Sequence, residues 1–178
     1  KKKKNNASAY ISALSRREKL PVTFKGVEGI KSYRGQRVGS SEWHDVTQEQ
    51  INMFADATKD WDWSHVDVEK AKTGPFGCTI AHGYWTLAML VPLLRDVYKL
   101  EDIGMGLNYG IEKARFPAPV LVNSRIRLHM TLKDVIDVKG GVQLLMGCEI
   151  ENDKADKPVL VADIIFRFYP SNQVAVNK

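Results

Sequence analysis

Two residues that can move protons stand close together near the middle of the sequence. Asp60 and His65 are five positions apart in the segment Asp60-Trp-Asp-Trp-Ser-His65. A carboxylate and an imidazole that share one water molecule can act as a general base and a general acid. Trp61 and Trp63 lie between them in the sequence, and we expect both rings to shield the pair from water. An Asp at a helix end and a surface His would give the same pattern, so the pair alone does not decide the function.

A second segment with chemical potential follows at residues 74–84, which read Gly-Pro-Phe-Gly-Cys-Thr-Ile-Ala-His-Gly-Tyr. This glycine-rich loop leads directly into a predicted helix, whose first amides have no acceptor inside the helix and can stabilise a developing oxyanion. Gly83 is the natural donor, because a residue without a side chain lets a carbonyl group approach the backbone. The alternative is a tight turn before a core helix.

The elements that must position these residues can be predicted from local patterns. Thr47 and Gln50 form a capping box, and apolar residues at helical spacing then continue to Thr58. Residues 59–79 lose this periodicity, apart from a possible helical turn at 68–72, and predict a structured loop. Residues 81–98 predict the longest helix, which is apolar on nearly all sides and therefore buried. Weaker helical patterns occur at 11–19 and 26–33.

The second half of the chain is predicted to form a sheet. A strand marked by Val38, Trp43 and Val46 is expected to end at Thr47. Long strands are expected at 107–116, 125–138, 141–151 and 159–169, separated by turn residues. Ile126, Leu128, Met130 and Leu132 alternate with polar residues, as in an antiparallel sheet with one covered face. The fold class is therefore α+β, with the long helix covering the sheet. The final strand, 159–169, is apolar enough to be at risk as a free edge.

Composition excludes several classes of protein. The chain has 178 residues, of which 44% are hydrophobic and 26% charged, as expected for one globular domain. It has no apolar run of membrane-spanning length and neither of the common glycine-rich phosphate-binding motifs. Cys78 and Cys148 lie seventy positions apart, so neither a zinc site nor a disulfide framework is expected. A reducing compartment, the cytoplasm, is the prediction.

Charge divides the chain into a basic head and a mildly acidic body. Residues 1–25 contain eight basic side chains and one acidic side chain, whereas the other 153 residues contain 18 basic and 20 acidic ones. We therefore predict a basic extension at 1–25, one domain at 26–170 and a tail at 171–178. The head lacks the apolar core of a secretory signal. Because the body has no excess of positive charge, no nucleic-acid partner is expected.

Both segments together resemble the MaoC-like (R)-specific enoyl-CoA hydratases, the hydratase 2 group, which have the hot dog fold. The family motif Asp-x-Asn-Pro-aliphatic-His, followed by an acid, matches at Asp60, His65 and Asp67, and a Trp at the Pro position is similar to the nodulation-protein-N-like branch. Further matches are Pro75-Phe-Gly77, His82-Gly83, Asn108-Tyr-Gly110 and Arg115-Phe-Pro-Ala-Pro-Val120. The resemblance covers about residues 36–169.

The resemblance implies reversible hydration of a trans-2-enoyl-CoA to the (R)-3-hydroxyacyl-CoA, with no metal and no other cofactor than the coenzyme A of the substrate. It implies that Asp60 and His65 hold the water and that the Gly83 amide stabilises the enolate oxygen. The substrate-binding residues expected beside them are Phe76, His82, Tyr84, Trp85, Lys113 and Arg115. It also implies a homodimer or a dimer of dimers. An acyl-CoA thioesterase on the same fold and a non-catalytic acyl-thioester-binding module are the alternatives.

Overall fold

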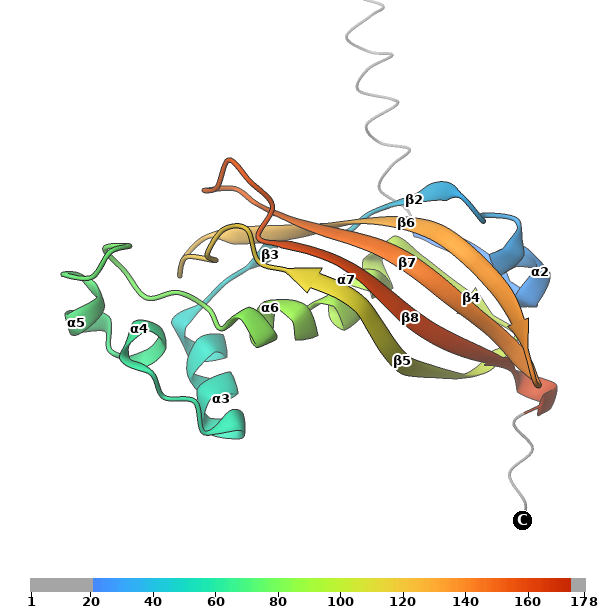
Figure 1. Ribbon diagram of the computed structural model, residues 1–178, viewed down its shortest axis with the longest axis horizontal. Helices are drawn as coiled ribbons and strands as arrows, with labels where there is room; N and C mark the ends of the chain where they lie inside the picture. Colours follow the sequence, from blue (N-terminus) through green and yellow to red (C-terminus); the bar gives the residue numbers. More distant parts are fainter. Residues whose placement is uncertain (1–20, 174–178) are drawn as a thin grey trace, which may run out of the picture.

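The computed structural model describes residues 21–173 and shows one curved sheet around a central helical segment (Figure 1). The helices are α2 (Gly26–Lys31), α3 (Gln48–Thr58), α4 (Trp63–Val66), α5 (Val68–Ala71), α6 (Gly83–Ala88), α7 (Leu90–Val97) and the 3-10 helix η1 (Ser171–Gln173). The strands are β1 (Val22–Lys25), β2 (Gln36–Ser40), β3 (His44–Asp45), β4 (Tyr98–Glu101), β5 (Ile103–Arg115), β6 (Arg125–Val138), β7 (Gly141–Asn152) and β8 (Leu160–Pro170). The predicted helix at 11–19 lies outside the described residues.

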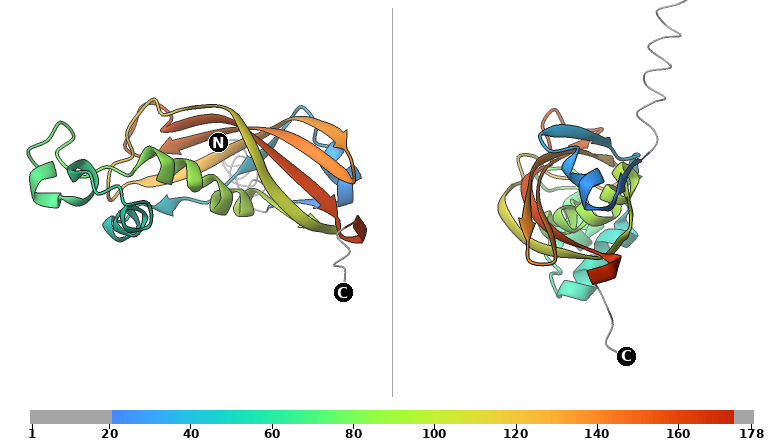
Figure 2. Two further views of the ribbon diagram at one scale, coloured as in Figure 1. Left: turned by 60° about the horizontal axis from the view of Figure 1, so that its bottom comes forward. Right: turned by 90° about the vertical axis from the view of Figure 1, so that its right-hand side faces the viewer.

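The large sheet is antiparallel and has the strand order β2-β6-β7-β8-β5, with β3 also paired to β6. Figure 2 shows that its concave face wraps around α6 and α7, while α3, α4 and α5 lie together beyond one end of the sheet. Strand β1 pairs with β4 in parallel as a separate two-stranded sheet. This arrangement confirms the predicted α+β class, with a helix wrapped by an antiparallel sheet.

Alternation of side chains along the strands accounts for the core. Ile126, Leu128, Met130 and Leu132 of β6 are all fully buried, as their period-two pattern predicts. The inward residues of β7 and β8 follow the same rule and pack against the apolar faces of α6 and α7. The predicted bounds of β6 agree with the structure, because local periodicity and the flanking turns specify this strand.

The predicted single helix at 81–98 is divided into α6 and α7, which meet at Met89. Pro92 is the third residue of α7 and has no backbone N–H, so it cannot donate to the carbonyl of Ala88 as a continuous helix requires. The segment ends earlier than predicted, because Tyr98 is already extended and begins β4. The capping box of Thr47 and Gln50 at the start of α3 is confirmed.

Two other expectations were wrong. The final strand is not a free edge, since β8 lies between β7 and β5; β5 forms one edge of the sheet and β2 the other. The domain also begins before residue 26, because β1 pairs with β4 and its Phe24 is fully buried in the core. In the part of the chain that the structure describes, no helix combines the length and apolar character needed to cross a membrane.

Candidate active site

The acidic residue of the site follows directly on helix α3. Lys59 ends this helix in the left-handed conformation, with φ 66°, and turns the chain so that Asp60 begins the loop towards α4. Asp62 then caps α4 by accepting hydrogen bonds from the amide and the hydroxyl of Ser64, which lower the pKa of its carboxyl. Asp67 caps α5 through the amide of Lys70. Asp62 and Asp67 therefore shape the loop, and Asp60 is left available.

His65 is held at its backbone and at its ring. The side chain of Gln48 in α3 donates to its carbonyl oxygen at 2.8 Å, and its own Nδ1 lies 2.7 Å from the carbonyl oxygen of Ile80. Because a carbonyl can only accept, Nδ1 must carry the proton of a neutral ring, which leaves the lone pair on Nε2. The side chain is partly buried. His65 thus presents one fixed nitrogen that can take up or return a proton.

His82 completes the cluster from a distant part of the chain. Its ring is 2% exposed and stacks on the ring of His65 with centroids 3.7 Å apart. Its Nε2 donates to the backbone carbonyl of Asp60 at 2.9 Å and lies 4.0 Å from the carboxylate of that residue. We predicted His82 as a substrate contact. The structure places its side chain behind Asp60 and His65, where it can orient both.

Asp60, His65 and His82 each offer one ligand atom, and these atoms lie within 4.8 Å of one another. Such residue types can bind Zn²⁺. A metal on His82 Nε2 would, however, replace its hydrogen bond to the Asp60 carbonyl, and the other nitrogen, Nδ1, is buried and has no partner in residues 21–173. The Asp60 carboxylate and His65 Nε2 are the two ligand atoms of this cluster that stay available, whereas zinc sites use three or four protein ligands.

Gly83 is the first residue of α6, so its amide has no acceptor within the helix. It is exposed, and a Cβ atom at this position would lie 3.6 Å from the ring of Phe116. Phe116 follows the last residue of β5 and is 43% exposed. The ring of Phe116 therefore forms one wall of the site. We did not predict Phe116 as a substrate contact. Only the pairing of distant segments could reveal this contact.

The expectation that two tryptophans enclose the pair was wrong. Trp61 is 53% exposed, and its indole N–H donates to Asp56 instead. Trp63 lies under the ammonium group of Lys70, 4.8 Å from its ring centroid. The side chain of Asp60 is 56% exposed as a result.

The other predicted substrate contacts are spread around the site and beyond it. Tyr84 is 74% exposed beside Gly83, whereas Trp85 belongs to the core with 6% exposure. Phe76 is exposed in the loop before α6. Lys113 forms an ion pair with Asp163 of β8 at 2.9 Å. Arg115, next to Phe116, makes no ion pair with any residue between 21 and 173.

The chain is similar in sequence or in fold to several known proteins. Residues 30–152 match the family described as MaoC like domain. The 3-hydroxyacyl-thioester dehydratase Z of Mycobacterium tuberculosis is 45% identical over 147 residues, which are 82% of this chain and 97% of the relative. Nodulation protein N of Rhizobium leguminosarum is 37% identical over 150 residues, 81% and 92% of the two chains. An R-hydratase of Pseudomonas aeruginosa has the same fold, with a TM-score of 0.63 at 20% identity, over 77% of this chain and 82% of its own.

The hot dog fold, the family match and the dehydratase relative define an enzyme of the hydratase and dehydratase class, the hydro-lyases. Within that class, the chain belongs to the MaoC-like family. The predicted family is thereby confirmed.

Proposed function

We propose that the protein is an (R)-specific enoyl-CoA hydratase, which adds water to a trans-2-enoyl-CoA to give the (R)-3-hydroxyacyl-CoA and also catalyses the reverse dehydration. The observation that carries this proposal is the close approach of the Asp60 carboxylate to two oriented imidazoles at an open surface. The names of the dehydratase and the R-hydratase among its relatives support it. Coenzyme A enters as part of the substrate.

In the proposed reaction, Asp60 and His65 Nε2 hold one water molecule between them. One of the two groups takes a proton from the water as its oxygen bonds to C3 of the substrate, and the other supplies a proton to C2. The negative charge that develops on the thioester oxygen is stabilised by the amide of Gly83. No electron leaves or enters the substrate, so the balanced step needs no redox cofactor, and we propose that it uses no metal.

We propose that a second copy of the chain completes the site by pairing along β5. This strand is one edge of the sheet, and Tyr109 and Ile111 on it are 53% and 51% exposed. Exposed apolar edge strands favour pairing with another strand. Since β5 ends beside Gly83 through Phe116, a dimer formed along this edge continues into the site. Two such dimers can associate further.

Two of the predicted substrate-binding residues, Lys113 and Arg115, carry a positive charge that could contact the phosphates of coenzyme A. Of these two, Arg115 is better placed to bind a phosphate group. Lys113 is engaged with Asp163, whereas within residues 21–173 the guanidinium of Arg115 donates only to the neighbouring carbonyl of Ala114. We propose that Arg115 contacts a phosphate of coenzyme A at the end of β5. A guanidinium group suits this contact because it can donate two parallel hydrogen bonds to a phosphate.

The test is loss of enoyl-thioester ultraviolet absorbance on adding the protein to crotonyl-CoA and octenoyl-CoA. We expect Asp60→Asn and His65→Gln each to lower kcat by about 10²- to 10⁴-fold. Asp67→Asn is a matched control, because it makes the same chemical change in the same loop and Asn can still cap α5. Formation of the (R)-3-hydroxyacyl-CoA without free thiol supports the hydratase. Release of free thiol indicates a thioesterase, and tight binding without turnover indicates a binding module.

A further inference from the structure

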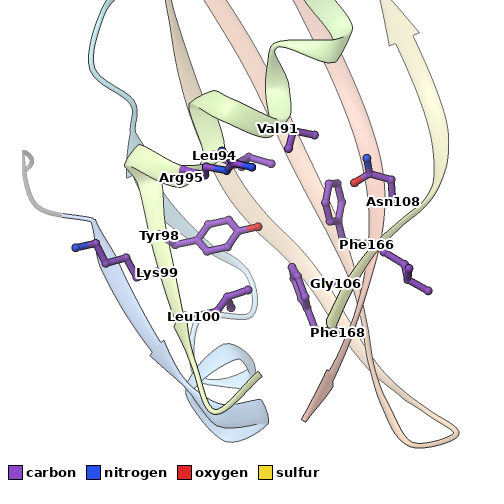
Figure 3. A pocket seen from close by; sticks show the side chains of 11 residues that line it. Val91, Leu94, Arg95, Tyr98, Lys99, Leu100, Gly106, Asn108, Phe166 and Phe168 are labelled. Carbon is purple, nitrogen blue, oxygen red and sulfur yellow. The ribbon is translucent and has the colours of Figure 1, made fainter. Parts of the chain in front are cut away.

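Two cavities lie on opposite faces of the large sheet. The cavity in Figure 3 is on the concave side, between α7 and strands β5 and β8, and apolar side chains form most of its wall. The other has a volume of about 530 Å³ and lies on the convex side, where His129 alternates with the buried Leu128 and Met130 of β6. Most residues that line this convex cavity are polar or charged, and none of them belongs to the Asp60–His65 cluster.

His129, which lines the convex cavity, stands between a serine hydroxyl and a carboxylate. Ser40 of β2 is its direct partner in the antiparallel pairing of β2 with β6, and Ser40 Oγ lies 2.7 Å from His129 Nδ1. The other ring nitrogen, Nε2, lies 3.0 Å from the carboxylate of Glu151 on β7. A serine becomes a nucleophile when a base lies within hydrogen-bond distance and a third group orients that base. Ser40, His129 and Glu151 meet these geometric conditions.

The positions of the protons follow from Arg37, whose guanidinium group can only donate hydrogen bonds. One of its nitrogens lies 3.0 Å from Ser40 Oγ and 3.3 Å from His129 Nδ1. Nδ1 therefore carries a lone pair and can accept a hydrogen bond from the Ser40 hydroxyl, while Nε2 carries the ring proton and donates to Glu151. His129 can thus take up the hydroxyl proton, and Arg37 can stabilise negative charge that develops on oxygen.

A β-bulge in β2 brings Arg37 and Ser40 to the same face of the sheet. In a regular strand, two residues three positions apart point to opposite faces. The register with β6 shifts between Arg37 and Gly39, so that Val38 is an extra residue in β2, and the side chains of Arg37 and Ser40 meet. Bulges often stand next to active sites, where they redirect a side chain. Here the bulge supplies the cation beside the hydroxyl.

The carboxylate of Glu151 is also held in place. Arg127 of β6, its direct partner across the strand pair, donates a hydrogen bond to it and lies over the ring of Trp43, 4.6 Å from the centroid. The side chains of His129 and Glu151 are 23% and 34% exposed, so solvent and a small ligand can reach them. Because Ser40, His129 and Glu151 stand on three paired strands, their relative positions are fixed by the sheet.

We propose that Ser40, His129 and Glu151 form a second catalytic site, which hydrolyses small carboxylic esters. The convex cavity beside His129 lies within the size range of about 300–1,000 Å³ that is typical of sites for small organic molecules. The proposal does not depend on hydration of an enoyl-CoA, because none of its groups belongs to the Asp60–His65 cluster.

In the proposed reaction, Ser40 Oγ bonds to the carbonyl carbon of the ester while its proton passes to His129 Nδ1. Arg37 stabilises the oxyanion, and Glu151 orients the ring and stabilises the imidazolium. The C–O bond of the ester then breaks, and the alcohol leaves with the proton from His129. Water, which gives a proton to His129, attacks the acyl group on Ser40. The carboxylic acid leaves, and the Ser40 hydroxyl is restored.

The test is release of p-nitrophenol from p-nitrophenyl acetate by the full chain. Ser40→Ala and His129→Gln should each lower kcat/KM at least about a hundredfold. Ser32→Ala is the matched control, because it removes a serine hydroxyl that donates to the carbonyl of Gly29, and its kcat/KM should equal that of the wild type. No release above the spontaneous rate, or equal rates for the wild type and Ser40→Ala, would overturn the proposal.

Covalent labelling of the wild type gives a second readout that needs no variant. Diisopropyl fluorophosphate reacts with an activated serine hydroxyl and loses fluoride, so mass spectrometry of the intact chain and of its peptides should find one adduct, on Ser40. Absence of this adduct, or an adduct on another residue alone, would refute the inference.

Glu151 acts through His129 as a positioning residue. Glu151→Gln should therefore lower kcat for p-nitrophenyl acetate about tenfold or more and change KM little, because the substrate is bound but the base is less well oriented. An unchanged kcat would contradict this role of Glu151.

Discussion

The rings of His65 and His82 stack face to face with their centroids 3.7 Å apart, although 17 positions separate these residues in the sequence. His65 is fixed by a carbonyl of the loop before α6, and His82 binds the backbone of Asp60. Asp60 and His65, the proposed catalytic pair, are therefore each held by a group from the segment 80–82. The relative position of Asp60 and His65 therefore depends on how residues 80–82 pack against the end of α3.

His82 should act as a positioning residue. His82→Phe keeps a ring of similar shape but loses the hydrogen bond to the Asp60 carbonyl, so we expect kcat to fall about tenfold or more, while KM changes little. His82→Gln, whose amide can donate to the same carbonyl, should restore part of the rate. Steady-state kinetics on crotonyl-CoA measures both values. A change in stability with unaltered kcat in the folded enzyme would assign His82 a purely structural role.

Gly83→Ala should separate catalysis from folding. Gly83 has no positive φ, and the new Cβ would stand at an ordinary contact distance of 3.6 Å from Phe116, so the unfolding free energy should change by less than about 0.5 kcal/mol. The methyl group stands beside the amide that we expect to bind the thioester oxygen, and kcat should fall at least tenfold. Gly39→Ala, whose Cβ would meet only Val97 at 3.7 Å, is the control. Full activity of Gly83→Ala would exclude the proposed oxyanion contact.

Metal removal should leave turnover unchanged. The ring nitrogens of His65 and His82 that face carbonyl groups are already engaged, so we expect water between the catalytic groups. The rate should be the same before and after dialysis against EDTA, and elemental analysis should find less than one equivalent of bound metal. Loss of activity with EDTA, restored by Zn²⁺, would instead make Asp60, His65 and His82 a metal site.

A charge on the β5 edge should break the dimer. Ile111→Lys places an ammonium group on the exposed edge, where a second copy would bury it, and we expect sedimentation velocity to show a monomer with reduced turnover. Ile136→Lys is the matched control, because Ile136 is similarly exposed, at 46% against 51%, but lies on β6. If both variants sediment like the wild type, β5 is not the interface.

Asp163 should contribute stability that depends on pH. Burial alone would raise the pKa of its carboxyl, but hydrogen bonds and charge from Lys133 and Lys113 outweigh it and hold the pKa below its ordinary value. Because the unfolded chain then binds more protons, this stability is present above about pH 4 and is lost as the pH falls through the folded pKa.

Asp163→Asn should therefore lower the unfolding free energy by about 2 kcal/mol at pH 7. The difference from the wild type, measured by urea unfolding, should shrink as the pH falls below about 4. A difference that is constant with pH would mean that the packing of Asp163, and not its charge, stabilises the sheet.

Local patterns were enough to predict much of this protein. The capping box at Thr47 and the alternation along β6 depend on residues only a few positions apart, so their physical consequences are contained in the sequence. The motif with Asp60 and His65 could be recognised, and the pair proposed as the reacting groups, for the same reason: both residues lie in one short loop.

Contacts between distant segments were decided only by the tertiary structure. The sequence could not show that His82 holds Asp60, that Phe116 faces Gly83 or that β5 forms one edge of the sheet, because each depends on how separate elements dock. The exposure of Trp61 has the same origin, since burial is a property of the packed chain. The sequence by itself thus determined most of the strands and the start of α3, and it brought the proposed pair together in one loop. Packing decided which side chains hold Asp60 and His65 in place, because those contacts join segments far apart in the sequence.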